Sequence, residues 1–245
     1  MKSIAIITIT KKPGRLILNT LYSLRQYVEH SPHLFSWHIY DSGDPSLEID
    51  QLLQLSTILP IAISRGHDKG IYKSLNSAIR SLSEMYSHVI FIHAGDCLTP
   101  AFFEYCLLSN LCMNSAYYFE YDFLDNPRWL RRPFIMFARF IEKKLKYGLP
   151  STHNSILYPT LYLKKYLYNL AYDCAADYEQ FLTMTENGIK FIPIQCLGVL
   201  VYRNGFISSR RKKSYLEYAS ILKNRSLLGF IYWVLKSKLV KNYAK

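Results

Sequence analysis

The fold is decided by the stretch from Ser64 to Asp96, which reads SRGHDKGIYKSLNSAIRSLSEMYSHVIFIHAGD. Its apolar residues first recur at helical spacing, from Ile71 to Leu82. A short apolar run, Val89 to Ile92, follows and is typical of a buried parallel strand. The stretch therefore predicts a charged loop, a helix and a strand, with Asp96 just beyond the carboxyl end of that strand.

The residues before this stretch repeat the same alternation. Apolar, β-branched runs predict strands at 4–10, 37–40 and 59–64, and helical spacing predicts helices at 15–28 and 47–55. A repeating order of strand and helix favours a parallel, doubly wound sheet with right-handed crossovers. The expected fold class is therefore α/β, a Rossmann-like and mostly parallel sheet flanked by helices.

Beyond Pro100 the pattern is less regular. We expect helices at 101–111 and 177–187, strands at 115–123, 155–158, 190–194 and 198–202, and a helical tail at 216–245. Residues 128–146 interleave basic and large apolar side chains, as in a helix on an anionic membrane surface or in an acceptor groove, and equally in an ordinary surface helix. The basic, tryptophan-containing tail likewise suits an interfacial helix or one that packs on its own domain.

The composition restricts the class of protein. Half of the 245 residues are hydrophobic, which indicates a packed chain rather than a disordered one. The formal net charge of +12 favours anionic partners such as nucleotides, nucleic acid or anionic lipid. The five cysteines have no CxxC spacing, which suggests reduced thiols in the cytoplasm. No signal peptide and no membrane-spanning helix is expected, because a span needs about 20 apolar residues.

Acidic residues follow three of the predicted strands: Asp41, Asp68 and Asp96. Ligands of open α/β sheets bind at the carboxyl ends of the strands, so these carboxylates are candidates to share one cleft. Asp41 could bond a base or ribose, and Asp96 could hold a divalent cation on a diphosphate. The alternative is that the charged loop is only a solvated helix cap. Neither GxGxxG nor GxxxxGK[ST] is present, so dinucleotide-binding and P-loop folds lose support.

Asp177 stands at the start of a predicted helix. Aspartate there most often caps the helix by accepting a backbone N–H bond. The functional alternative is a general base at the mouth of the cleft.

Five short motifs occur in a fixed order. They are Asp68-Lys69-Gly70-Ile71-Tyr72 with Asn76, Phe91-Ile92-His93-Ala94-Gly95-Asp96, Pro150-Ser151-Thr152-His153-Asn154, Ala175-Ala176-Asp177-Tyr178, and Asn204-Gly205-Phe206-Ile207-Ser208. Over roughly residues 3–210 the chain thereby resembles the inverting family-two glycosyltransferases of GT-A fold, in the branch that builds bacterial polysaccharides and O-antigen. Two departures stand out: His93 and Ala94 leave one carboxylate in the metal-binding element, and Lys73 replaces an acid.

The resemblance implies a role for each candidate residue. Thr8 and Asp41 would border the base and ribose, and Asp68, Lys69 and Asn76 would hold the nucleotide or its sugar. Asp96, with His93, would bind a divalent cation, Mn²⁺ or Mg²⁺. Asp177 would be the catalytic base. His153, Arg210 and Arg211 would lie on the acceptor or diphosphate side.

The function that the resemblance implies is transfer of a hexose, galactose or glucose, from a UDP-sugar to a lipid-linked saccharide such as GlcNAc-diphosphate-undecaprenol. Residues 1–210 would form the transferase domain, and the basic amphipathic tail 211–245 would hold it on the anionic inner face of the cell membrane. A relative that binds a sugar nucleotide without transferring it is the alternative. A nucleic-acid-binding protein is a further alternative, but carboxylates at the strand ends would repel phosphates, so no nucleic-acid partner is expected.

Overall fold

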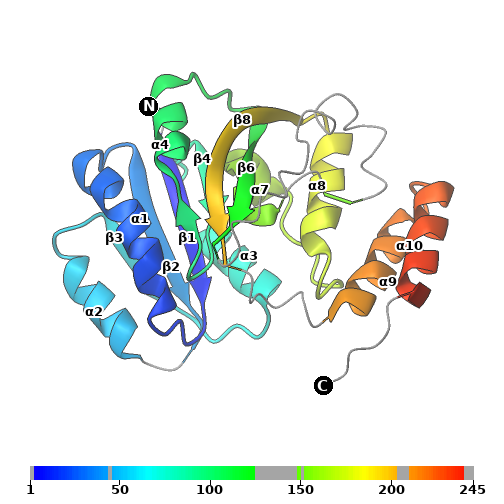
Figure 1. Ribbon diagram of the computed structural model, residues 1–245, viewed down its shortest axis with the longest axis horizontal. Coiled ribbons are helices and arrows are strands. Elements are labelled where there is room, and N and C mark those ends of the chain that lie inside the picture. The colour runs from blue at the N-terminus through cyan, green and yellow to red at the C-terminus, as the bar shows by residue number, and fades with distance from the viewer. Residues whose placement is uncertain (1–2, 44–45, 125–147, 150–151, 203–209, 240–245) are drawn as a thin grey trace.

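A computed structural model describes residues 3–43, 46–124, 148–149, 152–202 and 210–239. In these residues the strands form a sheet of order β3-β2-β1-β4-β7-β6-β8-β5 (Figure 1). The strands are β1 (Ile4–Thr10), β2 (Phe35–Asp41), β3 (Ile61–Arg65), β4 (His88–Phe91), β5 (Cys97–Leu98), β6 (Ser115–Phe123), β7 (Ile156–Pro159) and β8 (Lys190–Val201).

The first half of the sheet is parallel, as the sequence predicts. Strand β1 lies between β2 and β4 and runs parallel to both, and β3 runs parallel to β2. Strand β7 reverses the direction, since it pairs antiparallel with β4 and β6, while β6 and β8 are parallel to each other. The expected α/β class with a mostly parallel sheet is confirmed, and the carboxyl ends of β1 to β4 share one edge.

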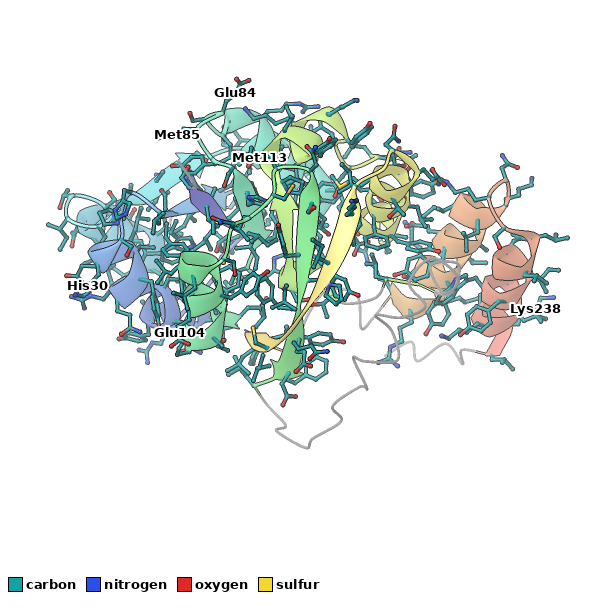
Figure 2. The ribbon with its side chains drawn as sticks, turned by 90° about the horizontal axis from the view of Figure 1, so that it is seen from above. His30, Glu84, Met85, Glu104, Met113 and Lys238 are labelled. Atoms are coloured by element: carbon teal, nitrogen blue, oxygen red, sulfur yellow. The ribbon has the colours of Figure 1, made fainter. Side chains whose placement is uncertain are left out.

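Helices cover both faces of the sheet. They are α1 (Leu16–His30), α2 (Leu47–Leu55), α3 (Ile71–Ser81), α4 (Pro100–Leu108), α7 (Thr160–Lys165), α8 (Ala176–Glu186), α9 (Arg211–Leu222) and α10 (Leu227–Leu239), with a 3₁₀ turn, η2, at His153–Ser155. Figure 2 shows α9 and α10 at one end of the molecule, away from the parallel strands.

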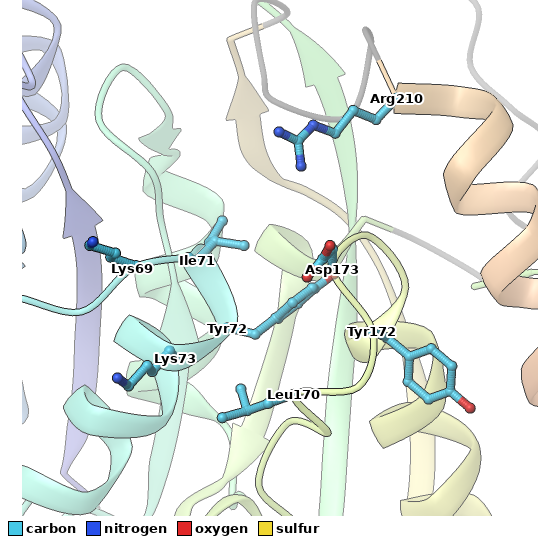
Figure 3. Close-up of a pocket in the computed structure, with 9 residues that line it drawn as sticks. Lys69, Ile71, Tyr72, Lys73, Leu170, Tyr172, Asp173 and Arg210 are labelled. Carbon is cyan, nitrogen blue, oxygen red and sulfur yellow. The ribbon is translucent and has the colours of Figure 1, made fainter.

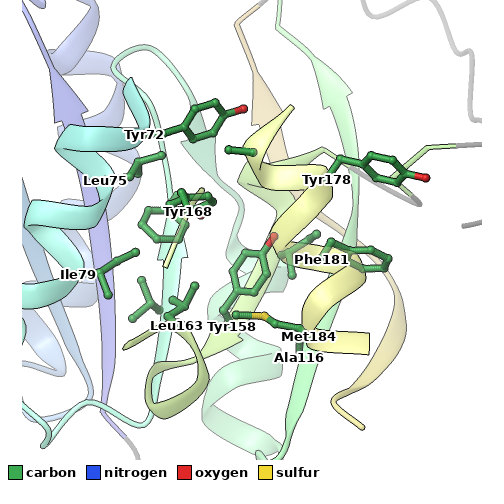
Figure 4. Close-up of a cluster of buried hydrophobic side chains, with 14 of the residues drawn as sticks. Tyr72, Leu75, Ile79, Ala116, Tyr158, Leu163, Tyr168, Tyr178, Phe181 and Met184 are labelled. Atoms are coloured by element: carbon green, nitrogen blue, oxygen red, sulfur yellow. The ribbon is translucent and has the colours of Figure 1, made fainter. Parts of the chain in front are cut away.

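The core is two buried clusters, one on each sheet face. Helices α1, α2 and α4 enclose one of them around Trp37 and Phe103. Helices α3, α8 and α9 enclose the other around Tyr158 and Phe181 (Figure 4). The periodic apolar face of α3, which includes Leu75 and Ile79, enters the second cluster. Burial of these side chains fixes the carboxyl edge of the sheet relative to α3 and α8.

Two predictions about the last third of the chain are wrong. The two strands expected at 190–194 and 198–202 form the single strand β8, which pairs with β6 through a register shift after Phe119. Glycine at position 198 makes this possible, because a Cβ there would lie 2.6 Å from the Cβ of Phe119. The single tail helix is the pair α9 and α10, in which Trp233 packs on Tyr218 with ring centroids 4.6 Å apart.

Three of the sequence features lie wholly or partly outside the described residues. They are the basic segment 128–146, the motif at 204–208, and residues 150 and 151 of the histidine motif. Among the helices that the structure does describe, none has the length and apolar character needed to cross a membrane.

Candidate active site

Asp177 lies in the first turn of α8 and is 7% exposed. Its Oδ1 accepts a hydrogen bond from the Tyr72 hydroxyl at 3.1 Å and another from the Tyr178 backbone N–H at 2.9 Å. The helix begins at Ala176 and Ala175 is its N-cap, so the interpretation of Asp177 as the N-cap is wrong. Burial raises the pKa of Asp177 to about 6, which suits a group that takes up a proton near neutral pH.

Asp96 follows β4 and joins three segments of the chain. Its Oδ1 accepts from the backbone N–H of Tyr202 at 2.8 Å. Its Oδ2 accepts from the backbone N–H of His93 at 3.2 Å and from the side-chain amide of Asn154. The hydroxyl of Thr20 fixes the same turn from α1, because it donates to the Asp96 carbonyl at 2.9 Å. Burial raises the pKa of the Asp96 carboxyl.

His93 lies beside this carboxylate, and His153 lies close to His93. His153 stacks on Phe91 with ring centroids 4.8 Å apart, and its Nε2 hydrogen-bonds the hydroxyl of Tyr168. Burial lowers the pKa of His153 to about 3. Burial also lowers the pKa of His93, although the nearby Asp96 opposes the effect. Burial therefore favours the neutral form of both imidazoles, and the Nε2 of His153 is already engaged by Tyr168.

The chemistry of this donor set limits how a cation could be held. Within the described ranges no three His, Cys, Asp or Glu side chains are placed to bind a metal ion. Asp96 already accepts three hydrogen bonds, and a carboxylate offers about four acceptor positions. Its remaining position and the His93 ring would therefore be the protein's ligands. Mg²⁺-type ions bind in this way, to one or two protein groups plus substrate phosphates.

Asp41 and Asp68 lie at the carboxyl ends of β2 and β3. Asp41 is 1% exposed, and its Oδ1 accepts from the Gly43 N–H at 3.1 Å. Its Oδ2 is buried without a hydrogen bond from any residue in the described part of the chain. Asp68 accepts from the Tyr40 hydroxyl at 2.6 Å, and hydrogen bonds from Ser77 and Tyr40 lower its pKa. A buried oxygen without a donor is costly, so Asp41 is suited to a ligand N–H or O–H.

Thr8 and Asn76 are engaged elsewhere. Thr8 is fully buried, and its hydroxyl accepts from the indole N–H of Trp37 at 2.9 Å. Asn76 is 2% exposed and bonds both backbone groups of Tyr168, donating to its carbonyl at 2.8 Å and accepting from its N–H at 2.9 Å. The structure does not bring either side chain to the sheet edge, and Asn76 instead holds the loop between α7 and α8.

A cavity of about 240 Å³ lies beside the Tyr72–Asp177 pair (Figure 3). It is lined by Lys69, Gly70, Ile71, Tyr72, Lys73, Leu170, Tyr172, Asp173 and Arg210. Arg211 is exposed and does not line it. Sequence reasoning missed Tyr72 as the partner of Asp177, although the residue stands in the motif that carries the resemblance. It also missed Asn154 and Tyr202 as partners of Asp96, since nothing local in the sequence signals those contacts.

The comparisons with known proteins agree with this geometry at the level of the fold. No protein-family model matches the chain, and the comparison with curated proteins gives no match. Among solved structures, S. aureus TarS aligns with a TM-score of 0.68 at 14% identity, over 93% of this chain and 40% of that one. TarS 1-349 in complex with UDP-GlcNAc aligns with a TM-score of 0.68 at 13% identity, over 96% and 72%.

The mannosyltransferase PcManGT from Pyrobaculum calidifontis, in complex with GDP-Man and Mn²⁺, has a TM-score of 0.66 at 15% identity, over 97% of this chain and 70% of that one. The chain spans about 40% of the length of the longer TarS chain. At these identities the likeness concerns the fold. The protein has the α/β fold that these glycosyltransferases share.

Proposed function

We propose that the protein is an inverting glycosyltransferase that moves a hexose, galactose or glucose, from a UDP-sugar to a lipid-diphosphate-linked saccharide. The observation that carries the proposal is Asp177, a buried carboxylate of α8 with a pKa of about 6 that accepts a hydrogen bond from Tyr72 of α3. The chain that carries Asp177 has the same fold as proteins whose structures were solved with UDP-GlcNAc and with GDP-Man. A general base is most effective when its pKa lies near the working pH.

The proposed reaction uses the two oxygens of Asp177 differently. Oδ1 accepts the hydrogen bonds from Tyr72 and Tyr178, and we assign Oδ2 to the acceptor hydroxyl. It takes the proton of the acceptor hydroxyl as that oxygen attacks the anomeric carbon. The bond from this carbon to the diphosphate breaks on the opposite side, and UDP leaves with the electron pair. The anomeric centre is inverted, so an α-linked donor gives a β-glycoside.

The donor would bind along the carboxyl edge of the sheet. The buried Oδ2 of Asp41 would accept a hydrogen bond from the base or ribose, and Asp68 with Lys69 would border the nucleotide. Mn²⁺ or Mg²⁺ would be held by Asp96, His93 and the donor diphosphate. Such a cation neutralises negative charge on a leaving diphosphate.

The surface of α10 supports a membrane-bound acceptor. Four residues at intervals of four form an exposed apolar ridge, and their exposed fractions are 69% for Leu227, 43% for Ile231, 56% for Leu235 and 81% for Leu239. Lys236 and Lys238 lie in the last turn of the same helix. Apolar residues beside lysines suit the anionic inner face of a cell membrane. We place the reaction there, in assembly of O-antigen, capsule or exopolysaccharide.

The second candidate is a protein that binds a sugar nucleotide without transferring the sugar. It is favoured by the cation site, where Asp96 is the single carboxylate and already accepts three hydrogen bonds.

The test is a donor panel of UDP-galactose, UDP-glucose, UDP-GlcNAc and GDP-mannose, with a synthetic GlcNAc-diphosphate-lipid and with Mn²⁺, Mg²⁺ or EDTA. Product mass and anomeric coupling would show a β-linked hexose. Asp177→Asn should lower turnover at least about 100-fold, the contribution of a general base. Binding of UDP without transfer from any donor would favour the second candidate.

A further inference from the structure

A hydrogen-bond network connects the Asp96 carboxylate to Tyr168, in the loop between α7 and α8. The side-chain amide of Asn154 donates to Oδ2 of Asp96. His153 shares the 3₁₀ turn η2 with Asn154, and its Nε2 hydrogen-bonds the Tyr168 hydroxyl. Asp96, Asn154 and Tyr168 are only 2%, 7% and 2% exposed. Water therefore competes little for these bonds, and they are electrostatically stronger than at the surface.

The contact between His153 and Asn154 gives the network its direction. Burial lowers the pKa of His153, whereas a hydrogen bond with the Asn154 side chain raises it. A bond that raises the pKa of an imidazole is made to an acceptor, because an acceptor favours the protonated ring. The acceptor in Asn154 is Oδ1, since its amide nitrogen donates to Asp96. His153 therefore carries its proton on Nδ1, and its Nε2 accepts from the Tyr168 hydroxyl.

Other contacts fix the Tyr168 hydroxyl next to His153. The backbone N–H and C=O of Tyr168 both bond the side chain of Asn76, in α3. Its ring packs on Tyr72 of the same helix with ring centroids 5.3 Å apart (Figure 4), and on Phe91 with centroids 6.2 Å apart. Burial raises the pKa of the Tyr168 phenol well above its usual value, so the hydroxyl stays protonated and remains a donor.

We propose that Tyr168 is a positioning residue for Asp96, acting through His153 and Asn154. Its hydroxyl keeps the His153 proton on Nδ1, this proton holds the amide oxygen of Asn154, and the amide N–H groups then point at Asp96. The inference rests on the proposed function, in which Asp96 helps to bind a divalent cation on the donor diphosphate. Both ring nitrogens of His153 are used within the protein, and neither is assigned to a substrate.

The opposite arrangement of the network would weaken the hold on Asp96. With its proton on Nε2, His153 would present Nδ1 as an acceptor, and the Asn154 amide would turn its N–H groups toward the ring. The amide oxygen would then face the Asp96 carboxylate, and two acceptors in contact repel each other. Asp96 would keep only the backbone bonds from His93 and Tyr202. The Tyr168 hydroxyl selects between these two arrangements.

The first test needs neither ligand nor variant. Long-range ¹H–¹⁵N correlation spectra distinguish the two neutral tautomers of a histidine, and we expect the Nδ1–H form for His153 in the full chain. Tyr168→Phe should lower the Nδ1–H fraction, because Nε2 loses its donor. Tyr158→Phe is the matched control and should leave the tautomer unchanged. The Tyr158 ring lies 5.9 Å from that of His153, and its hydroxyl bonds none of the residues that the structure describes.

The second test is calorimetric titration of UDP into the same chains, with Mn²⁺ and with EDTA. Mn²⁺ should raise the UDP affinity of the original chain and of Tyr158→Phe equally. In Tyr168→Phe this increase should be about three- to tenfold smaller, because Asp96 loses one fixed hydrogen bond. The UDP affinity of Tyr168→Phe in EDTA should stay within about twofold of the original, since Asp96 then holds no cation.

A second variant tests whether Tyr168 acts through the network. Asn154→Leu interrupts the network next to Asp96 and should reduce the Mn²⁺ effect as much as Tyr168→Phe does. The double variant should show no further loss, because two changes on one path are not additive. Additive losses would overturn the proposal, since Tyr168 would then act on the site independently of Asn154.

The remaining outcomes also decide the question. A His153 proton on Nε2 in the original chain would overturn the proposal, as would equal changes in Tyr168→Phe and Tyr158→Phe. A changed tautomer in Tyr168→Phe with an unchanged Mn²⁺ effect would overturn it too, because Tyr168 would orient His153 without positioning Asp96. UDP binding that Mn²⁺ does not strengthen in the original chain would remove the role of Asp96 and leave a UDP-binding protein. A chain that binds no UDP would contradict the proposed function itself, whatever the tautomer of His153.

Discussion

The hydroxyl of Tyr72 in α3 donates a 3.1 Å hydrogen bond to the carboxylate of Asp177 in α8, across 105 positions of the chain. Hydrogen bonds to a charged group contribute about 1.5–3 kcal/mol. This one favours the charged form of Asp177 and so opposes the increase in pKa that burial causes. The pair therefore both positions the proposed base and adjusts the pH at which it works.

Replacement of Tyr72 by Phe should raise the pKa of Asp177 further above about 6. The acidic limb of the kcat/KM profile would then move to higher pH, with a loss of about tenfold in kcat/KM near neutral pH. The measurement is a pH–rate profile between about pH 5 and 9. Tyr218→Phe is the control, because it removes a nearby hydroxyl that does not bond Asp177. An acidic limb at the same pH in Tyr72→Phe would show that the hydrogen bond from Tyr72 does not influence the pKa of Asp177.

Replacement of Asp177 by Asn should stabilise the fold at neutral pH while it removes transfer. The pKa of Asp177 is about 6 in the folded protein, against 3.8 for an unperturbed aspartate. The contribution of a carboxyl whose pKa is raised is fully present below the lower value and is lost as pH rises through the higher one. The variant should gain up to about 3 kcal/mol at pH 7.5 and nothing at pH 3.5. Urea unfolding at both pH values tests this, and a gain independent of pH would contradict it.

Asn76→Ala should lower the free energy of unfolding by about 2–4 kcal/mol, because it leaves the N–H and C=O of Tyr168 without partners in the core. The control Asn19→Ala removes an exposed amide of α1 and should stay within about 0.5 kcal/mol. Chemical denaturation measures both. Equal losses of unfolding free energy in the two variants would show that the hydrogen bonds from Asn76 to Tyr168 do not stabilise the fold.

Asp41→Asn should weaken UDP binding about tenfold, since a charge-assisted hydrogen bond would be replaced by a neutral one. The fold should not lose stability, because Oδ2 of Asp41 has no donor among the described residues. Calorimetry with UDP and a thermal melt give the two readouts. Asp50→Asn, which breaks an exposed ion pair with Arg65, should leave both the UDP affinity and the melting temperature nearly unchanged.

The apolar ridge of α10 should govern binding to vesicles. Leu235→Glu should abolish co-sedimentation with vesicles that contain phosphatidylglycerol, because it places a charge in the proposed membrane face. Leu161→Glu, at a residue of α7 that is 62% exposed, should bind as the original chain does. Binding should also weaken with salt and with pure phosphatidylcholine. Equal sedimentation of both variants would show that the ridge does not face the membrane.

Local patterns were sufficient for much of the fold. Strand β1, helix α2 and strand β6 have the bounds that were expected from the sequence. Polar residues flank β1 and α2 on both sides, and Asn114 precedes β6. Strand β8 was predicted in two parts, because its continuity depends on pairing with β6 rather than on its own residues. The division of the tail into α9 and α10 likewise depends on Trp233 packing back on Tyr218.

The residue pattern alone indicated the carboxylates of the candidate site, and the resemblance added His93, Lys69 and Arg210. The positions of the carboxylates after strands indicated Asp41, Asp68 and Asp96, since strand ends can be read from the sequence. Asn76 and Tyr168 are 92 positions apart in the sequence, and hydrophobic periodicity does not predict contacts between residues so far apart. The cavity could not be predicted for the same reason, because the starts of α3 and α9 meet there only after the sheet has formed.

Hydrogen bonds hold the loop between α7 and α8 at two places. The backbone of Tyr168 bonds the side chain of Asn76, and the backbone N–H groups of residues 173–174 bond the carboxylate of Glu217. Between these two sets of hydrogen bonds, Leu170 and Tyr172 form part of the cavity wall. Exchanges in this short span would reshape the wall without touching the sheet or the base. We therefore expect this span to be where relatives with differently shaped cavities diverge, and it is the natural place to begin a redesign of the cavity.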